Sequence, residues 1–444
     1  MFCWYSSENI GSAHTIWLDD FMDYRCYNLR LAVFVARKYL WKPRTPSACS
    51  STIVIGHLAQ HNLFQEASMV TGPGADIYRT LGVNPIIAAS GSTTAYGGSK
   101  LRPEVKDAIN KAAGTMVNMD ELNHAAGKII AQVTGAEAGF VSSGAAGGLI
   151  LQAAAVMAGN DPAKMNRLPD ATGMKNEFII HRSHRFPYDQ CYTATGGTFR
   201  EIGDGRRCHP WELEDALNEN TAAVVYLFSP FITRRALPFE EVVEIAHGHD
   251  VPVIVDAASF VPPRANLKRF IAQGADMVQY SGGKAVRGPQ GTGILCGRAD
   301  LIEAAFANAS PHQFIGRGMK VSKENIIGLV EAVQIFVEED EEAETKRYNE
   351  MCQQVVDALI EVPGLEATVE HDDYNYLVPH ALLTFTTEWR GPSRDDVFDA
   401  MVDGDPPIYL SNINNPDELA VDPLNLDDEE LEIVIRRLHE VLLD

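Results

Sequence analysis

Short apolar segments alternate with helical patterns through the middle of the chain. Helical patterns lie at 145–159, at 238–249 and near 265–273. The predicted strands are the apolar runs 138–144, 177–180, 198–203, 222–228, 251–259, 275–284 and 292–297. Strands that are apolar along their whole length, with helices between them, are typical of a mostly parallel sheet that helices cover on both faces. The sequence therefore predicts an α/β fold.

The pattern changes after about residue 320. A long helical pattern covers 323–360 and carries the acidic run EEDEEAE (338–344), which we interpret as a solvated helix face. A strand at 380–389 and an amphipathic C-terminal helix follow, and the apolar stripe of that helix consists of Leu431, Val434, Ile435, Leu438, Val441 and Leu442. We therefore expect a large domain over 69–320 and a smaller α+β domain over 321–444.

Residues 1–68 differ from the rest of the chain. They contain three of the seven cysteines and three of the five tryptophans, and they show no sustained strand or helix period. The stretch 29–44 has the pattern of a basic amphipathic helix, which leaves a targeting or partner-binding segment open, although aspartates nearby argue against a transit peptide. Because the stretch that starts at Met69 has the pattern of a natural beginning, we expect 1–68 to be an extension outside the fold.

The composition is that of a globular protein, with 45% hydrophobic and 22% charged residues among 444. A formal net charge of -23 argues against nucleic acid and anionic membranes as partners. No apolar run approaches the roughly 18–20 residues that a membrane span needs. The seven cysteines include no Cys-x-x-Cys pair, which predicts neither a zinc site nor a disulfide framework. We expect a cytoplasmic protein without a metal, whose partners are small molecules or protein chains.

Three motifs carry candidate chemistry. VSSGAAGG (141–148) is a glycine-rich turn between a strand and a helix, where free backbone N–H groups bind anions; alone it is a weak signal. Asp256 closes the apolar run PVIVD, at the strand end where open α/β sheets bind ligands, although a helix-capping aspartate is an equally good interpretation. Lys284 follows the next strand in SGGK and is either a satisfied structural charge or a reactive amine. The glycines favour the second, because they let a ligand approach the backbone closely.

Together the three motifs fit one cofactor, pyridoxal 5'-phosphate. Its phosphate would bind the turn 142–146 with help from the Ser281 hydroxyl. The Asp256 carboxylate would keep the pyridine nitrogen protonated, which the ring needs to accept electrons. Lys284 would form the Schiff base with the aldehyde, since burial lowers the pKa of a lysine and keeps its amine nucleophilic.

Two further stretches supply cations. In HRSHRFPYD (181–189), His184 is a candidate to stack on the pyridine ring, and Arg182 and Arg185 are candidates to bind an anionic substrate. Arg317 and Lys320 lie in the turn-like stretch GRGMKVSK. Four cations in so acidic a chain predict a substrate that bears a carboxylate and a phosphate. The alternative is that these cations pair with acidic residues and only hold the fold.

Four stretches carry a family resemblance: GAEAGFVSSGAAGG, HRSHRFPYD, ADMVQYSGGKAVRGPQGTGILCGR and GRGMKVSKENIIGL. They resemble the branch of fold-type I (aspartate-aminotransferase-like) pyridoxal-phosphate enzymes that contains bacterial selenocysteine synthase (L-seryl-tRNA selenium transferase) and D-glucosaminate-6-phosphate ammonia-lyase. The resemblance runs from about residue 76 to the C-terminus. SGGKAVRGPQ is its most specific motif. The cofactor-binding residues that it implies, together with the motifs above, are Ser142, Ser143, Gly144, Ala145, Ala146, His184, Asp256, Ser259, Ser281 and Lys284.

The resemblance implies a lyase that deaminates an amino acid or a phosphorylated amino-sugar acid, such as D-glucosaminate 6-phosphate, by β-elimination. The turn SSGAAGG departs from the asparagine-rich turn of the selenium transferase, HRSHRFPYD is similar to the sugar-acid lyase, and the acidic charge argues against tRNA. Selenium or sulfur transfer, transamination and a non-catalytic cofactor-binding regulator stay open. Enzymes of this fold usually build each active site from two subunits, which implies a homodimer or a larger homo-oligomer.

Overall fold

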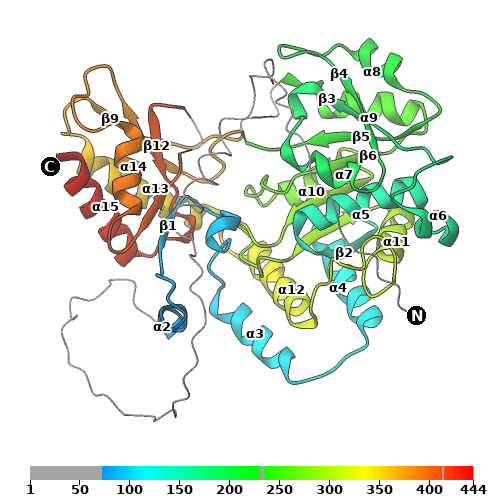
Figure 1. The fold of residues 1–444 in the computed structure, drawn as a ribbon, viewed down its shortest axis with the longest axis horizontal. Helices are drawn as coiled ribbons and strands as arrows, with labels where there is room; N and C mark the ends of the chain where they lie inside the picture. The colour runs from blue at the N-terminus through cyan, green and yellow to red at the C-terminus, as the bar shows by residue number, and fades with distance from the viewer. Residues whose placement is uncertain (1–72, 231, 233–234, 413–414, 444) are drawn as a thin grey trace, which may run out of the picture. The chain divides into compact units, whose positions relative to one another are not determined.

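The computed structural model describes residues 73–230, 232, 235–412 and 415–443. These residues belong to one compact unit that spans Glu66–Asp444 (Figure 1). The expected extension over 1–68 lies outside the described residues. Among the residues described, no helix combines the length and the apolar character that crossing a bilayer requires.

The described helices and strands alternate through the middle of the chain. The helices are α2 (Pro73–Thr80), α3 (Pro103–Ala113), α4 (Met119–Thr134), α5 (Gly144–Ala158), α6 (Pro162–Arg167), α7 (Gln190–Thr193), α8 (Pro210–Ala216), α9 (Phe239–Gly248), α10 (Asn266–Ala272), α11 (Ala299–Asn308), α12 (Lys323–Glu338), α13 (Glu341–Leu359), α14 (Arg394–Val402) and α15 (Asp428–Leu443). The strands are β1 (Ile87–Ala89), β2 (Ala138–Ser142), β3 (Glu177–His181), β4 (Thr198–Ile202), β5 (Thr221–Leu227), β6 (Val253–Asp256), β7 (Met277–Ser281), β8 (Gly293–Gly297), β9 (Leu365–Glu370), β10 (His380–Phe385), β11 (Ile408–Leu410) and β12 (Glu418–Val421).

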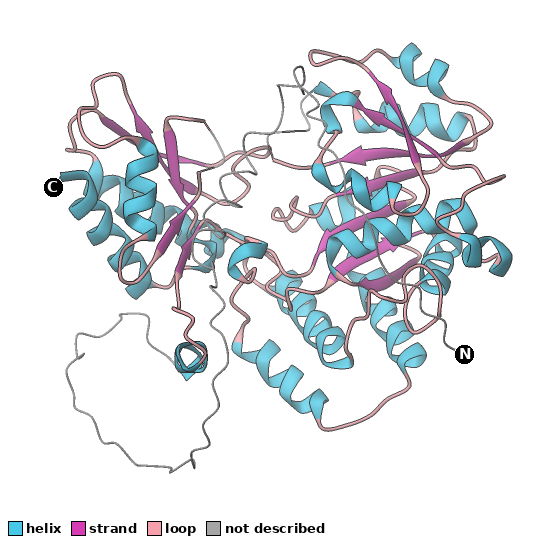
Figure 2. Cartoon of the chain, viewed as in Figure 1, coloured by secondary structure: helices cyan, strands magenta, loops and turns pink. Residues whose placement is uncertain are grey.

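The central sheet has seven strands in the order β2-β8-β7-β6-β5-β3-β4. Strand β8 runs antiparallel to both of its neighbours, and the other pairs are parallel. Helices pack on both faces of this sheet (Figure 2). In β6, Val253 and Val255 belong to one apolar cluster and Ile254 to the other, so the strand is buried on both sides. This explains the unbroken apolar runs and confirms the predicted mostly parallel α/β fold.

The C-terminal part of the chain builds a second apolar core. It contains the antiparallel sheet β12-β10-β9 and the helices α13, α14 and α15. Strand β1 pairs in parallel with β11, and its residues Ile87 and Ala89 are fully buried in this second core. A segment from the predicted large domain therefore contributes a strand to the smaller core, and the boundary between the two domains at 320/321 remains a proposal.

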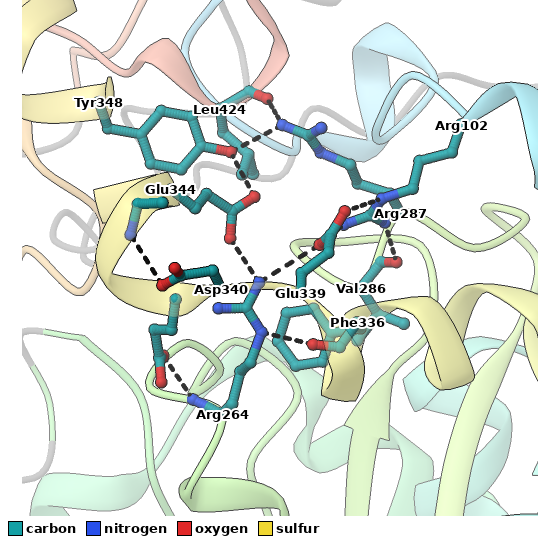
Figure 3. Close-up of polar contacts among 12 residues, drawn as sticks. Arg102, Arg264, Val286, Arg287, Phe336, Glu339, Asp340, Glu344, Tyr348 and Leu424 are labelled. Atoms are coloured by element: carbon teal, nitrogen blue, oxygen red, sulfur yellow. Dashed lines mark hydrogen bonds and ion pairs between the residues drawn. The ribbon is translucent and has the colours of Figure 1, made fainter. Parts of the chain in front are cut away.

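The helical pattern over 323–360 is two helices rather than one. Helix α12 ends at Glu338 and α13 begins at Glu341, after Asp340 accepts a hydrogen bond from the backbone N–H of Ala343 as the N-cap. The acidic run at this junction is also more than a solvated face, because Glu339 and Glu344 pair with the buried guanidinium of Arg264 (Figure 3). The interpretation of that run as a solvated face is therefore wrong for these two glutamates.

Candidate active site

The ends of neighbouring strands bring the predicted motifs together. Asp256 is the last residue of β6, Lys284 follows the adjacent strand β7 by three residues, and α5 begins directly beyond β2. Side chains at the carboxyl ends of parallel strands meet at one edge of the sheet. Asp256 and Lys284 accordingly line one cavity of about 370 Å³, together with Gly144, Ala145, Ala146 and Ser281. This volume lies within the range of small-molecule sites, roughly 300–1,000 Å³.

The two charged groups of the cavity are both buried. Burial raises the pKa of Asp256 to about 6, while a hydrogen bond from the Ala258 N–H to Oδ1 (3.0 Å) and the nearby charge of Lys284 act in the opposite direction. Burial lowers the pKa of Lys284, and the charge of Asp256 partly offsets this. Each group therefore loses solvation and gains from the other, and the neutral amine of Lys284 is easier to reach than that of a surface lysine.

The loop around Lys284 is closed by its own backbone. Gly282 donates to the carbonyl of Thr292 (2.9 Å), and Gly288 donates to the carbonyl of Gly282 (2.8 Å). A Cβ atom at Gly283 would lie 2.6 Å from the Cα of Gln290, which only a glycine avoids. The glycine before Lys284 thus lets the two arms of the loop pack together, a reason different from the predicted close approach of a ligand. The hydroxyl of Ser99, a residue outside this loop, donates to the carbonyl of Lys284 (2.9 Å) and helps to hold the loop in place.

The predicted phosphate turn divides into two parts. Gly144, Ala145 and Ala146, the first residues of α5, line the cavity. Ser142 is fully buried, and its hydroxyl is hydrogen-bonded to the carbonyl of Gly144 (2.9 Å) and to Oε1 of Gln279 (3.2 Å). Ser143 precedes α5 without a side-chain capping bond and is not among the lining residues. A contact from the Ser142 hydroxyl to a phosphate does not follow from this geometry, whereas the helix N-terminus is open to the cavity.

His184 does not line this cavity. Its ring is 1% exposed and packs edge-on against Tyr226, with the ring centroids 4.6 Å apart, and the Leu227 N–H donates to Nδ1 (3.3 Å). The aromatic ring that lines the cavity is that of Tyr188, from the same sequence stretch. The sequence predicts that the ring of His184 stacks on the pyridine, but it is Tyr188, four positions later, that the structure places in the cavity lining.

The four predicted substrate-binding cations lie outside the cavity lining. Arg182 pairs with Glu201 (3.0 Å), and Arg185 pairs with both Asp189 (2.5 Å) and Glu201. Both arginines are exposed, as are Arg317 and Lys320. Arg182 and Arg185 therefore pair with acidic residues, which is the alternative that the sequence left open, and none of the four cations lines either of the two cavities that Lys284 lines.

A second cavity of about 230 Å³ also reaches Lys284. Ser259, predicted to bind the cofactor, lines this cavity and not the first. The opposite wall comes from the C-terminal core and includes His380 and Asp422. Sequence reasoning missed these two residues. It also missed four polar residues in the lining of the first cavity, which are Ser92, Thr94, Tyr188 and Gln290.

Comparison with known proteins places this site in a family context. The family model described as SelA, L-seryl-tRNA selenium transferase, matches residues 93–362. The 5'-C-glycyluridine monooxygenase-decarboxylase of a Streptomyces species is 36% identical over 382 residues, which cover 84% of this chain and 94% of that protein. The D-glucosaminate-6-phosphate ammonia lyase of Salmonella typhimurium is 32% identical over 372 residues, covering 82% of this chain and 98% of that one.

A solved structure gives the same result for the fold. The structure of a D-glucosaminate-6-phosphate ammonia-lyase is 31% identical and superposes with a TM-score of 0.73, over 85% of this chain and all of the other. The predicted fold class, that of fold-type I pyridoxal-phosphate enzymes, is confirmed. The predicted family is confirmed as well, and both of the relatives described above are enzymes by name.

Proposed function

Because the chain belongs to the L-seryl-tRNA selenium transferase family, we propose that it is a pyridoxal-5'-phosphate enzyme and acts as a lyase. The lyase would eliminate a β-leaving group from an amino acid or a phosphorylated amino-sugar acid and release ammonia and a 2-oxo acid. The observation that carries this proposal is that Lys284 and Asp256 line one cavity at the N-terminus of α5. The ammonia lyase among the relatives supports the reaction class.

The donor set of the cavity fits this cofactor. A phosphate dianion suits the first turn of α5, at Gly144–Ala146, because a helix N-terminus offers N–H groups and the positive end of the dipole. The hydroxyl of Ser281 lies in the same lining. Asp256 would hold the pyridine nitrogen and Lys284 the aldehyde carbon. When bound, the cofactor supplies an electron sink for negative charge that develops at the substrate Cα.

The protein's own groups would manage the protons. Burial lowers the pKa of the Lys284 amine, so its Nζ would take the Cα proton and return it to the departing β-group. Asp256, whose pKa burial raises to about 6, would be driven to its ionised form by a protonated ring nitrogen beside it. Tyr188 would cover the ring from the side of the cavity that it lines. No oxidant enters this reaction.

A second candidate reaction is an oxygen-dependent decarboxylation. It is favoured by the 36% identity to the monooxygenase-decarboxylase across 94% of that protein. The two reactions differ in their co-substrate and product, since the decarboxylation consumes O₂ and releases CO₂. Incubation of the cofactor-loaded protein with candidate amino acids, with and without air, separates them.

The experiment has three outcomes. Ammonia and a 2-oxo acid formed without O₂ support the lyase. Turnover that requires O₂ and releases CO₂ replaces the lyase with the decarboxylase. Spectral binding of amino acids without any turnover under either condition identifies a non-catalytic regulator and overturns both enzyme proposals.

We also propose that the protein is a cytoplasmic homodimer or larger homo-oligomer. Around α2, Ile77, Tyr78, Leu81 and Val83 expose 52–74% of their surface, an apolar strip that a second copy would cover. Light scattering coupled to size exclusion measures the mass directly, and a monomer at micromolar concentration would contradict the proposal.

A further inference from the structure

The turn that carries Lys284 lies where two apolar cores meet. The backbone N–H of Arg287 donates to the carbonyl of Lys284 (2.8 Å), which closes the turn 284–287. Ala285 is buried in the second apolar core, and Val286 is buried in the core on one face of the central sheet. The turn is therefore anchored in both cores, and any contact that fixes the turn also fixes the backbone from which the Lys284 amine extends.

Arg287 ends this turn in an uncommon backbone conformation. Its φ of 57° lies in the left-handed region, which residues with a side chain rarely adopt. Such conformations persist where surrounding contacts enforce them, and they cluster at functional sites. The guanidinium of Arg287 makes contacts of this kind, because its Nη2 donates to the hydroxyl of Tyr348 (2.7 Å) and to the carbonyl of Leu424 (2.5 Å) (Figure 3). This arginine ties the turn to α13.

A second arginine holds the same turn through its backbone. Nη1 of Arg102 donates to the carbonyl of Val286 (2.9 Å). Nε of the same guanidinium donates to Oε1 of Glu339 (2.8 Å), and its Nη2 donates to Oε2. The side chain of Arg102 is only 8% exposed, so its charge needs this carboxylate. Glu339 thereby orients the guanidinium that binds Val286.

The contacts of both arginines meet at the junction between α12 and α13. The hydroxyl of Tyr348, which accepts a hydrogen bond from Arg287, donates to Oε1 of Glu344 (3.1 Å). The guanidinium of Arg264 bridges Glu344 (2.8 Å) and Glu339 (3.3 Å) (Figure 3). Replacing buried ion pairs by apolar side chains of similar size often leaves stability unchanged, so stability alone does not explain this cluster. Fixing the position of the turn explains why both sets of contacts end at one junction.

We propose that Tyr348 and Arg102 are positioning residues for Lys284. They hold the turn so that the Lys284 amine meets the aldehyde carbon of the cofactor, where attachment forms a C=N bond and releases water. Neither residue is among the described residues that line the two cavities beside Lys284, so both act through the turn and not by touching the cofactor. This inference rests on the proposed function, because it takes Lys284 as the amine that binds the cofactor.

The rate of cofactor attachment tests the inference. It is followed by the visible absorbance that appears when pyridoxal 5'-phosphate is added to the cofactor-free protein, at a temperature well below the melting transition of every variant. Calorimetry measures the Kd of 4'-deoxypyridoxine 5'-phosphate, which has a methyl group in place of the aldehyde and cannot react with Lys284. Tyr348→Phe should slow attachment about tenfold and Arg102→Met about 10- to 100-fold, while the Kd of the aldehyde-free analogue stays within about twofold.

Tyr226→Phe is a matched control for the loss of a buried tyrosine hydroxyl. The hydroxyl of Tyr226 donates to the carbonyl of Leu237 (2.9 Å), far along the chain from the turn. Its loss should lower the melting temperature and leave the attachment rate unchanged. Tyr348→Phe keeps its ring, so it serves as the test if Arg102→Met does not fold.

The failures of this inference and of the proposed function are distinguishable. An unchanged attachment rate in a folded variant overturns the positioning role of that residue and leaves the proposed function intact. Weaker binding of the analogue, to the same extent as the loss in rate, overturns the inference too, because the whole site is then altered. Equal slowing in Tyr226→Phe overturns it as a general effect of lost stability. An unaltered protein that gains no visible absorbance with pyridoxal 5'-phosphate contradicts the proposed function itself.

Discussion

Replacing Asp256 with asparagine should have opposite effects on the cofactor-free and cofactor-loaded proteins. In the cofactor-free protein the carboxylate is buried, and burial disfavours its ionised form. Burial therefore raises the pKa of Asp256 to about 6 from an ordinary value of 3.8. Its contribution to folding stability is therefore fully present below pH 3.8 and is lost as the pH rises through about 6. Asparagine keeps the shape of the side chain and the acceptor for Ala258 but removes the charge.

The magnitude follows from that pKa difference. Each pH unit corresponds to about 1.4 kcal/mol, so an ionised Asp256 costs the cofactor-free protein at most about 3 kcal/mol at pH 8. The gain from Asp256→Asn is smaller than this limit, because the substitution also removes the attraction that favours the charged form of Lys284. We expect the variant to melt at a higher temperature than the unaltered protein at pH 8 and at about the same temperature near pH 4.

Thermal unfolding of both proteins, stripped of cofactor, at several pH values measures this difference. Asp276→Asn is a matched control, because Asp276 is also buried but accepts bonds from Arg298 (3.0 Å), His247 (2.8 Å) and the N–H of Val253 (2.7 Å). The control variant should be destabilised at pH 8. Adding cofactor should reverse the order for Asp256, since the ring nitrogen then lacks its partner, and kcat should fall by orders of magnitude. If Asp256→Asn is less stable without cofactor at pH 8, the carboxylate is a structural cap and the reasoning is refuted.

Two further substitutions and one truncation test other parts of the account. Arg287→Met removes the hydrogen bonds to Tyr348 and Leu424 and should lower the melting temperature. It should also raise KM more than it weakens cofactor binding. An unchanged KM would show that these two hydrogen bonds do not position the site. Arg185→Met should leave KM within about twofold and lower the melting temperature slightly, because its ion pairs are partly exposed, whereas a tenfold rise in KM would restore its role in substrate binding. A chain that begins at Met69 should fold, bind cofactor and oligomerise as the full chain does, and aggregation would show that 1–68 is structural.

The sequence was most informative where one local pattern decides the outcome. Strand β6 is buried on both faces, so its residues form a continuous apolar run whose end at Asp256 can be read directly. Parallel strands end at the same edge, which is why Asp256 and Lys284 could be placed together from their positions after neighbouring apolar runs.

Contacts between distant segments were not predictable in this way. Arg102 reaches Glu339 across 237 positions, so the acidic run at 338–344 looked solvent-facing when its partners were unknown. His380 begins β10 and Asp422 directly follows β12, and only the folded chain brings both into the lining of a cavity that also contains Lys284. His184 and Tyr188 lie in one short stretch, but which ring lines the cavity depends on the turn geometry between them.

The attachment of the cofactor to Lys284 tests the central claim most directly. The protein is loaded with pyridoxal 5'-phosphate, reduced with borohydride, digested and analysed by mass spectrometry, with Lys284→Ala treated in parallel. We expect the reduced cofactor on the peptide that contains Lys284 and on no peptide of the Lys284→Ala variant. Labelling of Lys268 or Lys323 instead, or no labelling at all, would contradict the account.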